Sequence, residues 1–118
     1  MVKIESLKDY IGILSEEEFI QLAKKIYDIT DFICEDYPKH KEWFFHQQIP
    51  RIFTPNGEIL FARDENDRDK IVAVACLKKD LDERKICTLY VSEQFRGQHL
   101  GTKMIEESIK FLGTTKPF

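Results

Sequence analysis

Hydrophobic residues follow a helical period in the first half of the chain. After a capping box in which Ser15 and Glu18 can satisfy each other's backbone N–H groups, apolar residues recur every three or four positions. This spacing predicts an amphipathic helix over 15–36. A second, short helix is predicted over 40–48 and carries three consecutive aromatic residues. Pro50 is expected to break it, because proline donates no backbone hydrogen bond.

The period changes to the alternation of strands in the second half. Strands are predicted over 58–63, 71–77 and 85–91, with short polar turns between them, and 2–7 alternates weakly as an edge strand. Helical spacing returns over 100–112, followed by a glycine placed to end that helix. Three strands joined by short turns predict an antiparallel meander. We therefore expect an α/β fold of the α+β type, with a mostly antiparallel sheet and helices on its faces.

Length and charge limit what the chain can bind. Its 118 residues suit a single domain over 1–118, and 42% of them are hydrophobic, which favours a packed core over disorder. Lysine and arginine number 18 against 21 aspartate and glutamate, so the net charge of −3 offers no general attraction for nucleic acid or an anionic membrane. No stretch approaches the roughly 20 apolar residues of a membrane span. We expect a protein that binds neither nucleic acid nor membranes.

The N-terminus and the cysteines indicate a cytoplasmic protein. Residues 1–5 lack the basic and then apolar run of a secretory signal. The three cysteines, an odd number, have no metal-ligand spacing, so we expect reduced thiols and no metal site. Cys76 and Cys87 are expected to face each other across the hairpin 71–91.

The segment 94–102 has the composition of an anion-binding loop. It follows a predicted strand, contains Gly97 and Gly101, and leads into the first turn of the helix 100–112. The first turn of a helix leaves backbone N–H groups without partners, and glycines let an anion approach them closely. A phosphate or pyrophosphate is therefore the expected ligand, with Arg96 able to add a charged hydrogen bond.

Two glycines after a strand also occur in loops that bind nothing, where they serve only the turn and close packing. The spacing fits neither of two common nucleotide loops. No Gly-Lys-Ser/Thr follows, which excludes a P-loop, and there is no G-x-G-x-x-G with an acidic residue further on, which excludes a dinucleotide-binding loop. A phosphate-binding module of another kind stays open from the residues alone.

A family resemblance rests on the same segment. Motif A of the GNAT acetyltransferases has the core (Gln/Arg)-x-x-Gly-x-(Gly/Ala) between a strand and a helix, and 94–99, Gln-Phe-Arg-Gly-Gln-His, resembles it. The order of elements, a strand, two helices, three antiparallel strands, a loop and a helix, is also similar to that family. The resemblance is specific over 58–112 and only architectural over 1–57. It implies a GNAT-like, mostly antiparallel sheet flanked by helices and lacking the last strands.

The resemblance implies that acetyl-CoA binds as cosubstrate through this segment. Backbone N–H groups of the loop would hold its pyrophosphate, and the strand before the loop would hydrogen-bond the pantetheine arm, with one N–H polarising the thioester carbonyl. GNAT enzymes transfer the acetyl group directly to an amine, so the acceptor would be a small-molecule or protein amine. The cofactor-binding residues implied in this way are Leu89, Tyr90, Val91, Arg96, Gly97, Gln98, His99, Leu100, Gly101 and Thr102.

Two departures from the family pattern bear on activity. His99 stands where the family has Gly or Ala, and its imidazole is expected to face solvent, with a contact to phosphate as the alternative. The chain ends at 116–118, where the fifth strand of the family would begin, so no general acid or base is assigned. Since an unpaired strand edge can pair with another chain, a homodimer or a completing partner is expected. The alternative to an N-acetyltransferase is a catalytically incomplete CoA-binding or interaction module that needs such a partner.

Two further groups of residues are weaker candidates. Thr88, Tyr90 and Glu93 lie near the implied thioester position and are candidates for a base or a water-holding residue, although each is more typical of a surface or packing role. The aromatic cluster 43–45, Trp-Phe-Phe, is a candidate for the wall of the acceptor pocket, with a core or lid role as the alternative.

Overall fold

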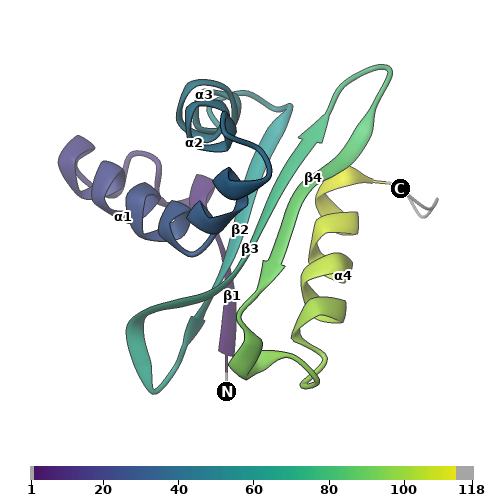
Figure 1. Cartoon of the computed structure of the whole chain (residues 1–118). Helices are drawn as coiled ribbons and strands as arrows, with labels where there is room; N and C mark the ends of the chain where they lie inside the picture. Colours follow the sequence, from purple (N-terminus) through teal and green to yellow (C-terminus); the bar gives the residue numbers. More distant parts are fainter. Residues whose placement is uncertain (1, 114–118) are drawn as a thin grey trace.

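The computed structural model describes residues 2–113 and contains a four-stranded antiparallel sheet (Figure 1). Its strands lie in the spatial order β1-β2-β3-β4, and each pairs with the next. The predicted meander, the α+β fold and the weakly predicted first strand are therefore confirmed. Residues 114–118, which include the segment where the family's fifth strand would begin, lie outside the described residues. The strand bounds are β1 (Val2–Ser6), β2 (Gly57–Asp64), β3 (Asp67–Lys79) and β4 (Arg84–Val91).

Helices cover both faces of the sheet. α1 (Glu16–Asp28), α2 (His40–Trp43) and α3 (Ile49–Arg51) lie on one face, and α4 (Leu100–Leu112) lies on the other (Figure 1). α4 has the predicted bounds, and Gly113 ends it with a left-handed φ of 67°, a conformation that glycine adopts without strain.

α1 begins as predicted and ends earlier than predicted. The Ser15 hydroxyl accepts from the Glu18 N–H at 3.1 Å, and the Glu18 carboxylate accepts from the Ser15 N–H at 3.0 Å, so the capping box is confirmed. The helix ends at Asp28, and the predicted continuation to 36 is wrong. The reason is the buried Thr30, whose N–H and hydroxyl both donate to the carbonyl of Tyr27 at 2.8 Å and close the chain into a tighter turn.

The second helical segment does not break at Pro50, so that prediction is wrong. α2 continues into a π turn over Phe44–Gln48 and then into α3, which contains Pro50. The wider turn ends at Gln48, two residues before the proline, whose nitrogen has no hydrogen to donate. The backbone therefore rearranges around the missing hydrogen bond instead of ending the helix.

The core consists of two apolar layers, one on each face of the sheet. Ile59 and Phe61 of β2 pack toward α1 and α2, whereas the alternating Leu60 and Ala62 pack toward α4. The layer beneath α4 also contains the apolar side chains of α4 itself, Leu100, Met104 and Leu112. This packing fixes the start of α4, and with it the end of the preceding loop, against the sheet.

A buried glutamine fastens the helical layer to the sheet. The side-chain nitrogen of Gln48 donates to the carbonyls of Glu58 and Leu77, at 3.0 and 3.1 Å, and these two residues are partners across β2 and β3. Its side-chain oxygen accepts from Arg51 at 2.8 Å. The C-terminal end of the segment 40–51 is therefore held at one position along the sheet.

The cysteines are free thiols, and the pairing of two of them differs from expectation. Cys76 pairs with Thr88 across β3 and β4, not with Cys87, because the register shifts between Cys76 and Leu77. The expected direct pairing of Cys76 and Cys87 is therefore wrong by one residue. Burial raises the pKa of the Cys76 thiol, which favours its neutral form.

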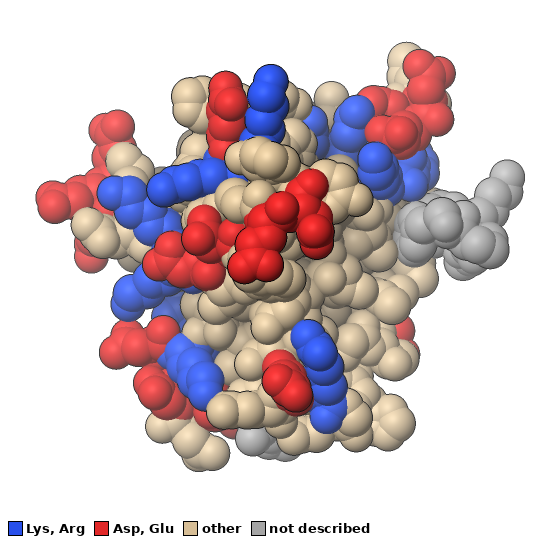
Figure 2. All heavy atoms as spheres, in the orientation of Figure 1, with Lys and Arg blue, Asp and Glu red and all other residues tan. Residues whose placement is uncertain are grey.

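Charges of both signs are interspersed on the face of the molecule that Figure 2 draws. Neither positive nor negative residues form a large patch in Figure 2, and uncharged residues cover most of the visible surface over β4 and α4. Within residues 2–113, no helix is both long and apolar enough to cross a bilayer. The same residues contain no cluster of three or more His, Cys, Asp or Glu placed to hold a metal ion.

Candidate functional site

The loop between β4 and α4 forms a hollow of about 330 Å³. A short 3-10 turn over Glu93–Phe95 follows the strand, and Gly97 and His99 then take left-handed φ values of 81° and 62° before α4 begins. These two conformations turn the backbone sharply around the hollow. The residues that line it are Val91, Arg96, Gly97, His99, Gly101 and Thr102. Six of the ten predicted cofactor-binding residues are thus brought together.

The backbone N–H groups of this loop are free. In the described part of the chain, no acceptor takes a hydrogen bond from any N–H of 97–102, whereas the N–H groups of Arg96 and Lys103 on either side bond to backbone carbonyls. Gly101 leaves space above them, since a Cβ built there meets only Val91, at 3.9 Å. Consecutive free donors at the start of a helix concentrate partial positive charge, which suits a phosphate or diphosphate.

The outer edge of β4 is open next to this loop. The Ser92 N–H donates to the Val72 carbonyl at 2.8 Å, so residues at even positions of this part of β4 turn their backbone groups toward β3. The N–H and C=O groups of Leu89 and Val91 therefore point away from the sheet. Because β4 is the last strand of the described sheet, the two N–H groups and the Leu89 carbonyl are available to an extended ligand, whereas the Val91 carbonyl already accepts from Arg96.

Arg96 lies beside the open edge. Its Nε donates to the Val91 carbonyl at 2.9 Å, and its guanidinium carbon lies 5.6 Å from the centre of the Tyr90 ring. The side chain therefore places a positive charge where the strand edge meets the loop, without an ion-pair partner among residues 2–113.

The other four predicted residues direct their side chains elsewhere. Leu100 is 2% exposed and packs in the core, so only its backbone faces the loop. The Gln98 amide donates to a backbone carbonyl of the same loop at 3.3 Å. Leu89 is 39% exposed, and Tyr90 packs against Phe32 with their ring centres 5.0 Å apart. Any ligand contact from Leu100 would therefore come from its backbone, whereas the backbone groups of Tyr90 face β3.

His99 has an unusual backbone for its residue type. Within residues 2–113 it is the one non-glycine residue with a positive φ, and its exposed side chain makes no capping hydrogen bond to α4. The left-handed conformation costs an L residue about 1–2 kcal/mol and glycine nothing comparable. The expected exposure of the imidazole is confirmed, and the backbone explains why glycine suits this position.

We expect His99→Gly to raise the free energy of unfolding by about 0.5–1 kcal/mol, because glycine adopts this φ without a Cβ clash. His99→Ala removes the imidazole but keeps the Cβ, so it should give no such gain. Urea unfolding of the three proteins measures the difference. Equal stabilisation by both variants would show that the imidazole, and not the backbone, carries the cost.

The weaker candidates for a base are separated in space. Thr88 is half-buried and lines a second hollow, Tyr90 packs beneath Arg96, and Glu93 is exposed in the 3-10 turn. Thr88 and Tyr90 line two different hollows, of about 750 and 600 Å³.

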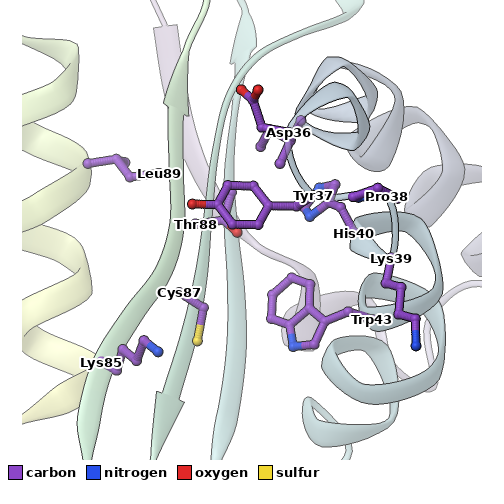
Figure 3. A pocket seen from close by; sticks show the side chains of 11 residues that line it. Asp36, Tyr37, Pro38, Lys39, His40, Trp43, Lys85, Cys87, Thr88 and Leu89 are labelled. Atoms are coloured by element: carbon purple, nitrogen blue, oxygen red, sulfur yellow. The ribbon is translucent and has the colours of Figure 1, made fainter.

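The second hollow, of about 750 Å³, lies between the segment 33–43 and β4 (Figure 3). Trp43 lines it, whereas Phe44 is fully buried in the core and Phe45 packs on Phe44 with their ring centres 5.0 Å apart. Of the aromatic cluster 43–45, Trp43 therefore lines a hollow, whereas Phe44 has the alternative core role. Sequence reasoning missed Tyr37, which lines the same hollow and whose only hint was an aromatic ring immediately before a proline.

Solved structures with this fold include acetyltransferases. A GNAT-family acetyltransferase from Staphylococcus aureus Mu50 matches with a TM-score of 0.67 at 11% identity, over 96% of this chain and 67% of that one. The PaiA N-acetyltransferase of Thermoplasma acidophilum, in complex with coenzyme A, gives 0.59 at 18% identity, over 96% and 72%. Glucosamine-6-phosphate N-acetyltransferase of Arabidopsis thaliana gives 0.53 at 18% identity, over 96% and 75%. Identities this low establish the fold alone.

Sequence comparison establishes the family. No curated protein sequence matches the chain. The model of the acetyltransferase (GNAT) family matches residues 18–115, which include the loop and α4 and make up more than half of the chain. The chain spans between 37% and 75% of the lengths of the solved structures that it resembles. The chain therefore belongs to the GNAT acetyltransferase family.

Proposed function

We propose that this protein is an acetyl-CoA-dependent N-acetyltransferase that transfers the acetyl group directly to an amine. The observation that carries the proposal is the run of free N–H groups at 97–102 beside the open edge of β4. The loop offers donors for a diphosphate, and the edge offers alternating donors and acceptors for an amide-containing arm. Coenzyme A contains both groups, and it is bound in the structure of the PaiA enzyme.

Each part of the site has a distinct role in this proposal. The N–H groups of Gly97 to Thr102 hold the pyrophosphate, and Arg96 adds positive charge beside it. The outward N–H groups of Leu89 and Val91 and the outward carbonyl of Leu89 pair with the pantetheine arm. Tyr90 holds the strand in place by packing against Phe32.

The reaction depends on proximity and on a polarised carbonyl. The amine nitrogen attacks the thioester carbon, the C–S bond breaks, and the proton that the amine loses ends on the CoA thiol. An outward N–H of β4 would donate to the carbonyl oxygen, on which negative charge develops. Binding both substrates along one strand converts a bimolecular encounter into a reaction between aligned groups. We assign no general acid or base.

One observation favours the second candidate function, a CoA-binding or interaction module that needs a partner. In the described sheet, β4 has a neighbour on one side only. A second copy or another chain can pair with that open edge and form the far wall of the cofactor site. In this case the chain would bind acetyl-CoA but release no CoA in the presence of amines until the partner is added.

Titration calorimetry with acetyl-CoA, with ATP as the control ligand, tests the proposal. ATP carries phosphates but has no pantetheine arm, so we expect saturable heat with acetyl-CoA and little with ATP. Release of free CoA thiol on addition of amines then separates an enzyme from a binding module. Equal heats from both ligands would contradict the proposal and favour a phosphate-binding module of another kind.

A further inference from the structure

The larger hollow has walls of different chemistry. Tyr37, 70% exposed, extends from the helical segment toward β4, and Trp43 stands beside it (Figure 3). On the opposite side, Cys87, Thr88 and Leu89 of β4 form the wall. The hollow therefore reaches the open strand edge, where the proposed function places the thioester.

The plane of Trp43 is held by a stack of rings. Trp43 stacks on His40 with their centres 5.8 Å apart and an angle of 24°, and His40 stacks on Tyr27 at 5.6 Å and 28°. His40 is itself fixed by a hydrogen bond between its Nε2 and the Thr30 hydroxyl, at 3.0 Å. Burial lowers the pKa of His40, an effect that the Asp31 carboxylate partly offsets, so the ring favours its neutral form. Trp43 therefore offers a rigid flat surface to the hollow.

The charges around the hollow do not suit a polycation. Lys39 and Lys85 line it, against one acidic residue, Asp36. None of the three forms an ion pair within residues 2–113. Any protonated amine meets two like charges and a single carboxylate here, and the repulsion grows with each further amino group of a polyamine. A flat apolar body on a monoamine would in addition contact two aromatic rings.

We propose that this hollow binds the amine acceptor and that the acceptor is a monoamine carried on an aromatic group. Its ring would pack against Tyr37 and Trp43, and its nitrogen would face Thr88 and Leu89 at the strand edge. The inference rests on the proposed function, since it names the substrate class of that same reaction. The products are the N-acetyl arylalkylamine and CoA thiol, with no other reactant needed.

The fluorescence of Trp43 provides a test that needs no turnover, because it is the only tryptophan in the chain. Titration with 2-phenylethylamine, in the presence of CoA, should change the emission saturably, and spermidine at the same concentrations should not. Tyr37→Ala should weaken 2-phenylethylamine binding by about three- to tenfold and leave acetyl-CoA binding unchanged. Phe53→Ala removes another exposed aromatic ring, 58% exposed and away from the hollow, and should change neither.

The possible failures are distinguishable from those of the proposed function. If acetyl-CoA binds but 2-phenylethylamine leaves the emission unchanged, or if spermidine binds equally well, the aromatic acceptor is overturned and the proposed function stands. If acetyl-CoA itself does not bind, the proposed function is overturned, and the assignment of this hollow as an acceptor site is overturned with it. Unchanged amine affinity in Tyr37→Ala also overturns the assignment.

Discussion

Gly97→Trp is expected to abolish acetyl-CoA binding. Gly97 lines the hollow, with a φ of 81°, and a Cβ built there meets no atom within 4 Å. An indole at this position would occupy the space above the free N–H groups and strain the backbone that aims them. We expect the affinity to fall by at least about a hundredfold, which corresponds to about 2.7 kcal/mol of binding free energy. Titration calorimetry measures the loss.

Gly12→Trp is the matched control for this variant. Gly12 has a φ of 82°, and a Cβ built there also meets nothing within 4 Å, but it lies outside the loop. Both substitutions therefore impose the same backbone strain and add the same side chain to an open space. Wild-type affinity in Gly12→Trp and none in Gly97→Trp supports the site. If Gly97→Trp folds and keeps its affinity, the loop does not hold the cofactor.

Phe44→Ala is expected to lower the free energy of unfolding by about 3–5 kcal/mol, a large fraction of the stability of a small protein. Phe44 is fully buried, and its ring centre lies 5.2 Å from that of Tyr27 and 5.0 Å from that of Phe45. Removing its ring leaves a cavity beneath the ring stack that supports Trp43. Urea unfolding measures the loss.

Phe45→Ala, at the next position, is the control for burial. Phe45 is half-buried, so its truncation leaves a smaller cavity, and we expect a loss of about 1–2 kcal/mol. If the Phe44 variant does not fold, Phe44→Leu keeps most of the buried volume and should lose less than Phe44→Ala. Equal losses for Phe44→Ala and Phe45→Ala would contradict the assignment of Phe44 to the core and Phe45 to its margin.

Much of the fold was predictable because its elements have long, regular patterns. α4 kept its predicted bounds, since apolar residues follow one stripe and a glycine ends the helix. The end of α1 was not predictable, because it depends on Thr30, whose hydroxyl bonds to a carbonyl one turn back and to His40. The helix through Pro50 was missed for a similar reason, since a π turn is not visible in hydrophobic spacing.

The candidate site was predictable in its location and not in its detail. The glycines and the position before a helix indicated the loop, because these features follow from backbone chemistry. The attachment of Arg96 to the edge of β4 and the place of Tyr37 in the wall of the larger hollow depend on contacts between distant segments. The aromatic cluster 43–45 shows the same limit, because a sequence cannot tell which of three neighbouring rings faces the core.

If the free N–H groups at 97–102 bind phosphate groups, as we propose, the stability of the chain depends on its buffer. Phosphate and sulfate suit such donors, and a solute that binds the folded chain alone stabilises it by mass action. At a phosphate concentration a hundred times its dissociation constant, the gain is about 2.7 kcal/mol. In such a buffer the wild type would gain stability that Gly97→Trp could not. Variants of this loop are therefore comparable with the wild type only in weakly binding anions such as chloride.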